Sequence, residues 1–111
     1  MPPKIKEMRL DLDYTGINLA DEEKNMSNID LTSAVITNAI YNYAKQAGGL
    51  HQNERKQVYT IEKAIKNNEN GVVKIDSTDV GFLRKIFREV KLTPNSILEK
   101  VDTMIEEISK E

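Results

Sequence analysis

The chain has 111 residues, enough for one small domain that buries an apolar core without metal or disulfide support. It has no cysteine, which excludes disulfides, thiolate nucleophiles and cysteine-bound zinc, and an intracellular setting is favoured. The net charge of −2 provides no long-range attraction to nucleic acid or to an anionic membrane, although a local basic patch can still act.

The first predicted element is a strand over residues 8–14. Apolar and charged residues alternate there, and the apolar ones are Met8, Leu10, Leu12 and Tyr14. This period of two is typical of a strand with one buried face. The polar segment that follows, from Gly16 to Asn28, predicts a solvated connection.

Two helices are expected next. The segment LTSAVITNAIYNYAKQA has apolar residues at helical spacing, and Asp30 precedes it as the expected N-cap. Gly48 and Gly49 end this helix, because glycine adopts the left-handed conformation of a helix C-terminus without a Cβ clash. A second helix is predicted from about Asn53 to the polar segment KNNENG.

A turn, a strand and a third helix follow. Asn70-Gly71 predicts the turn, and VVKID predicts a short strand because valine and isoleucine suit a pleated, half-buried surface. The segment DSTD can cap the third helix, with Asp79 in its first turn, where the helix dipole favours a negative charge. This helix is expected to run to about Val90.

The last helix is predicted to begin after Thr93 as N-cap, with Pro94 at its first position. Its apolar stripe consists of Ile97, Val101, Met104 and Ile108. A stripe of this kind normally faces the core of its own chain, and we favour that use. The alternative is self-association, with each last helix meeting its copy in a two-fold dimer.

Together these elements predict an α+β fold that is mainly helical, with about four helices and a small two-stranded sheet in the order β-α-α-β-α-α. We expect a single domain over residues 1–111, frayed at 1–5 and 109–111. The expected core comprises Leu83, Phe87, Ile97, Val101 and Met104 together with Leu10, Leu12, Ile36, Ile40 and Ile75.

The alternating N-terminal strand, the helix LTSAVITNAI, the strand–helix unit VVKIDSTDVGFLRKIF and the closing helix SILEKVDTMIEEI resemble small uncharacterised proteins encoded in bacteriophage and prophage genomes. The resemblance extends from Lys6 to Ile108 and lies in the order of elements, with no invariant motif. It implies the same fold order and a place in the cytoplasm of a bacterial host. No functional residues carry over, because the group has no agreed activity.

Residues with catalytic or metal-binding chemistry are sparse. His51 is the only histidine and stands in a polar stretch near Glu54, which is typical of a surface residue. Asp11 and Asp13 share one strand face but lack the glycine-hinged loop of a calcium site. Gly48-Gly49 lacks the lysine and hydroxyl residue of a phosphate-binding loop. We therefore expect no enzyme activity, no cofactor and no metal site.

The third helix has a basic side opposite an apolar arc of about 160°. Its members, the candidate partner-binding residues, are Arg84, Lys85, Arg88 and Lys91. The simplest interpretation is a solvated back on a core helix. The other interpretation is contact with an acidic group, which belongs to nucleic acid, to another protein or to the acidic last helix of this chain.

A helix-turn-helix DNA reader is disfavoured, because the last helix carries several carboxylates against one lysine, Lys100, in its regular span. Any nucleic-acid role would use the third helix or the group Lys45, Arg55 and Lys56. The leading hypothesis is a small non-enzymatic accessory protein that acts by protein–protein interaction or self-association. The alternative is a nucleic-acid-binding regulatory protein that uses the basic face of the third helix. Neither hypothesis involves a membrane.

Overall fold

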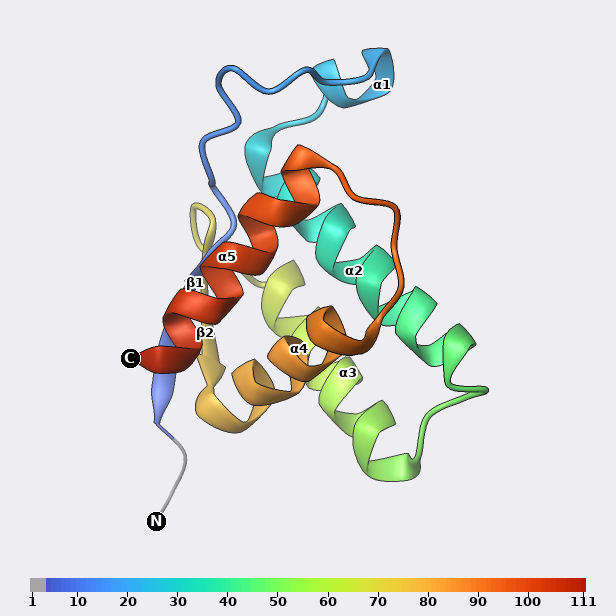
Figure 1. Ribbon diagram of the computed structural model, residues 1–111. Coiled ribbons are helices and arrows are strands. Elements are labelled where there is room, and N and C mark those ends of the chain that lie inside the picture. Colours follow the sequence, from blue (N-terminus) through green and yellow to red (C-terminus); the bar gives the residue numbers. More distant parts are fainter. Residues whose placement is uncertain (1–3) are drawn as a thin grey trace.

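The computed structural model describes residues 4–111. Its elements are β1 (Ile5–Arg9), α1 (Asp21–Lys24), α2 (Asn28–Gln46), α3 (Gln52–Lys66), β2 (Val72–Asp76), α4 (Ser77–Glu89) and α5 (Ser96–Lys110) (Figure 1). The predicted mainly helical α+β class is confirmed, and so is the β-α-α-β-α-α order of its main elements. The short helix α1 is an addition, because it forms inside the segment that was predicted to be a solvated connection.

The two strands pair antiparallel, with Ile5 opposite Asp76 and Arg9 opposite Val72. The predicted turn at Asn70-Gly71 precedes β2, and both residues have positive φ angles of 53° and 85°. The prediction of a strand over residues 8–14 is wrong in its bounds. Pairing ends at Arg9, whose partner Val72 is the first residue of β2, and the backbone N–H of the next residue, Leu10, bonds the Gly71 carbonyl of the turn at 2.7 Å.

Two helix starts also differ from expectation. The N-cap of α2 is Ser27 and not Asp30, since the Ser27 hydroxyl accepts a hydrogen bond from the Asp30 backbone N–H at 3.1 Å. The N-cap of α5 is Asn95 and not Thr93, because the Asn95 side chain accepts from the backbone N–H three residues later at 2.8 Å. Pro94 consequently lies before the helix. In both cases the capping side chain belongs to a residue in extended conformation.

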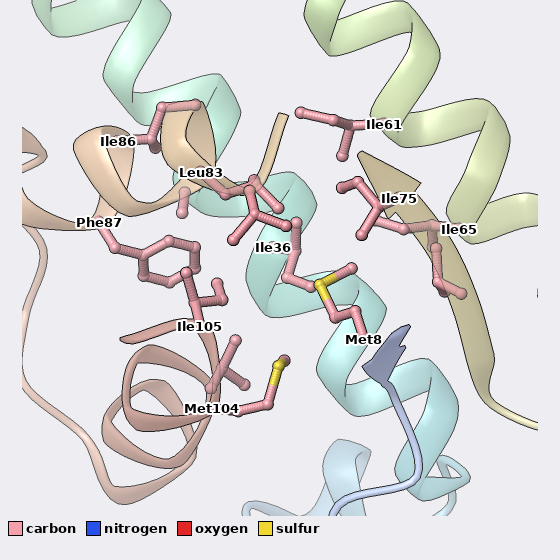
Figure 2. Close-up of a cluster of buried hydrophobic side chains, with 14 of the residues drawn as sticks. Met8, Ile36, Ile61, Ile65, Ile75, Leu83, Ile86, Phe87, Met104 and Ile105 are labelled. Atoms are coloured by element: carbon pink, nitrogen blue, oxygen red, sulfur yellow. The ribbon is translucent and has the colours of Figure 1, made fainter. Parts of the chain in front are cut away.

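The main core cluster gathers apolar side chains from α2, α3, α4, α5 and the strands (Figure 2). Nine of the ten expected core residues are buried, and Leu12 is half-buried. Ile97 is buried away from the main cluster, in a second one with Tyr14 and Leu31. There the Tyr14 hydroxyl is hydrogen-bonded to that of Thr32, which gives the buried polar groups a partner.

The apolar stripe of α5 faces the interior of this chain. Its four residues are Ile97, Val101, Met104 and Ile108, and each is at most 8% exposed. This is the intramolecular use that the sequence favoured. The helix continues to Lys110, and its end lies beside β1, where the Lys6 ammonium donates hydrogen bonds to the carbonyl groups of Ile108 and Glu111 at 2.7 and 2.6 Å (Figure 1).

Candidate functional site

The basic side chains of α4 are positioned by the core packing of that helix. Asp76 caps its N-terminus by accepting the backbone N–H of Asp79 at 2.9 Å. The opposite face is buried through Val80, Phe82, Leu83, Ile86 and Phe87. Arg84, Lys85 and Arg88 therefore point away from the main cluster, toward α5 and the solvent.

Glu106 of α5 binds two of these residues at once. One carboxylate oxygen is 3.1 Å from Nη2 of Arg84, and the other accepts a hydrogen bond from Nε of Arg88, also at 3.1 Å. The hydrogen bond from Arg84, followed by the charges of both arginines, holds the pKa of Glu106 below its usual value. Of the three acidic partners that the sequence left open, the structure thus supplies the chain's own last helix.

A surface groove of about 400 Å³ adjoins the basic side chains of α4. We call it the α4 groove. Its lining consists of Lys6, Ser77, Gly81, Arg84, Lys85, Arg88, Glu89 and Ser109. Strand β1, helix α4 and the end of α5 thus converge on one hollow that holds four cationic side chains and one carboxylate.

One N–H of the Arg84 guanidinium forms no hydrogen bond. Its Nε atom is buried from solvent, and no residue between 4 and 111 accepts its hydrogen bond. A buried N–H without an acceptor costs stability. Guanidinium and ammonium groups in such a hollow bind carboxylate or phosphate oxygens.

Three of the four predicted partner-binding residues meet at this groove, namely Arg84, Lys85 and Arg88. Lys91 does not, because it lies beyond α4, where its backbone N–H and carbonyl group both bond the side chain of Gln46. Sequence reasoning missed Lys6. No local pattern in the sequence indicates that β1 begins beside the last turn of α5.

The other candidates for chemistry have ordinary partners. Asp11 receives both nitrogens of the Arg9 fork at 3.0 and 2.9 Å, and Asp13 accepts the backbone N–H of Thr15 at 2.9 Å. His51 is exposed at the N-cap of α3, and its backbone N–H donates to Glu54. Between residues 4 and 111, no three side chains of the metal-binding types come together in a geometry that could hold an ion.

No protein-family model matches the chain, and neither the curated proteins nor the solved structures include a significant match. Over the part of the chain that the structure covers, no helix combines the length and apolar character needed to cross a membrane.

Proposed function

We propose that this chain is a small non-enzymatic accessory protein that binds another protein, and that the α4 groove receives an acidic segment of that partner. The observation that carries the proposal is the convergence of four cationic side chains on one hollow. The contact to Glu106 supports it further, because the two arginines of the groove already donate to a carboxylate in their present conformations.

The surroundings of the groove favour a peptide over a nucleic acid. Glu89 lines the hollow, and Glu106 stands at its arginines. The neighbouring face of α5 is rich in carboxylates, which repel the continuous phosphate backbone of a duplex. A short acidic peptide segment needs only a few cations and avoids this repulsion.

Binding of a fluorescein-labelled heptaglutamate peptide tests the proposal, with a heptaglutamine peptide as the uncharged control. We expect Lys85→Glu to weaken heptaglutamate binding, since Lys85 lines the groove and is exposed. Lys110→Glu is the matched control, because it makes the same charge change at an exposed position outside the groove lining. Equal losses in the two variants would mean that net charge, and not this groove, governs binding.

Glu106→Gln is a second test, in which the affinity for heptaglutamate should rise and not fall. This variant removes the internal carboxylate and leaves both arginines available. We therefore expect tighter heptaglutamate binding. An unchanged or lower affinity in a folded Glu106→Gln protein would refute the role assigned to the two arginines.

A further inference from the structure

The outer face of α3 forms a second basic surface, separate from the α4 groove. The inner face of this helix is buried and includes Ile61 and Ile65. The residues on the outer face are all exposed and recur at spacings of three or four, so they lie in one stripe along the helix. The α3 stripe comprises Gln52, Arg55, Lys56, Tyr59, Lys63 and Lys66.

Tyr59 stands in the middle of this stripe and is 67% exposed. Two surface hollows flank it. One has a volume of about 500 Å³ and includes Arg55 and Lys56 in its lining, and the other, of about 470 Å³, includes Lys63 and Lys66. The ring of Tyr59 lines both hollows. An exposed aromatic ring is thus bracketed by two cations on each side. Three of them are about one helical turn away, and Lys66 is about two turns away.

The cations of the α3 stripe are free to bind a ligand. Lys56, Lys63 and Lys66 form no ion pair with any residue between 4 and 111. Arg55 is held in place through a hydrogen bond from its guanidinium to the Leu50 carbonyl at 2.8 Å, which leaves its charge unopposed. Glu62 is the only carboxylate that lines either hollow. This differs from α4, where Glu106 occupies two of the arginines.

We infer that the α3 stripe binds single-stranded nucleic acid, with an unpaired base stacked on Tyr59 and the phosphates on its two sides held by the flanking cations. Stacking on an exposed aromatic ring and electrostatic contact to the backbone are the two components of single-strand binding. In a duplex the faces of the bases are covered by their neighbours, so Tyr59 would have no stacking partner. An acidic peptide could pair with the lysines but offers no flat ring for Tyr59.

Fluorescence anisotropy with labelled oligothymidylate and oligouridylate of about 15 nucleotides tests the inference, and it separates DNA from RNA as the source of the strand. A mixed-sequence duplex of the same length is the third probe. We expect a Kd below about 100 µM at about 50 mM salt for at least one of the single strands. With up to four phosphate contacts, the slope of log affinity against log salt should lie between about −2 and −3.

Tyr59→Ala is the decisive variant, and Tyr41→Ala is its matched control. Tyr41 is exposed to a similar extent, 64%, but lies on α2 outside the α3 stripe. Loss of the stacking ring at position 59 should weaken single-strand binding about tenfold, whereas the control should leave it unchanged. Both side chains are exposed, so both variants should fold, which far-UV circular dichroism verifies.

Charge reversal locates the phosphate contacts. Lys63→Glu should reduce the magnitude of the salt slope by about 0.7, and Lys85→Glu, the same change in the α4 groove, should leave the slope unchanged. The inference is overturned if no single strand binds, or if the two tyrosine variants behave alike. It is also overturned if the duplex or heptaglutamate binds as tightly as the single strands and loses as much affinity in Tyr59→Ala. A larger loss of single-strand affinity in Lys85→Glu than in Lys63→Glu would overturn it as well.

Discussion

Replacement of Leu83 by alanine tests the packing that positions the α4 groove. Leu83 is 0% exposed and belongs to the main core cluster, together with Ile36 of α2 and Ile75 of β2 (Figure 2). The variant loses three buried carbons, each stabilising the fold by about 0.8 kcal/mol. A residual cavity of about 50 Å³ adds about 1 kcal/mol at about 24 cal/mol per Å³. We expect the free energy of unfolding to fall by about 3–4 kcal/mol.

Urea denaturation followed by far-UV circular dichroism measures this loss. The expected value is a large fraction of the total stability of about 5–15 kcal/mol that a small domain has. Ile5→Ala is the control, because it also removes three carbons but from a side chain that is 67% exposed in β1. Its cost should stay below about 1 kcal/mol. If Leu83→Ala cost no more than Ile5→Ala at an unchanged m-value, the burial assigned to α4 would be wrong.

Three further variants address charge and burial. Burial raises the pKa of Asp79, so its carboxylate costs stability once it is ionised. Asp79→Asn should therefore raise the melting temperature at neutral pH. This gain should shrink as the pH falls toward the unfolded pKa of about 3.9. The pKa of Glu106 is lowered, so Glu106→Gln should lower the melting temperature at neutral pH, with a difference that disappears in acid. The reverse pH trend in either variant would contradict these assignments. Val101→Glu places a charge at a fully buried position and should unfold the chain, as seen by circular dichroism, whereas a folded monomer would show that the stripe of α5 is not core.

Local patterns predicted most of the fold because the responsible interactions are local. The end of α2 at Gly48-Gly49 and the turn at Asn70-Gly71 depend on φ angles that glycine and asparagine adopt readily, and the structure has positive φ at all four residues. The helix α1 was missed because its four residues bury no side chain, so no apolar period marks it.

Features that depend on distant contacts could not be predicted in the same way. The bounds of β1 follow from where β2 begins, and a single strand contains no record of its partner's first residue. One local feature was also predicted wrongly: Ser27 and Asp30 are both good N-cap residues, and only the observed hydrogen bond distinguishes them. In the α4 groove, the basic residues of one helix were visible in the sequence, whereas the contribution of Lys6 required β1 and the end of α5 to be placed side by side.

The two basic surfaces differ in whether a carboxylate of the same chain already pairs with their cations. In the α4 groove, the proposed ligand carboxylate would compete with Glu106, which is already bonded to Arg84 and Arg88. Binding there would exchange one ion pair for another, so the gain in affinity would depend on ligand geometry more than on net charge. The α3 stripe has no such internal competitor among residues 4–111, so its affinity should follow the number of phosphates it neutralises. Glu106→Gln should therefore strengthen ligand binding in the α4 groove and leave binding at the α3 stripe unchanged, and this difference separates the two surfaces within one protein.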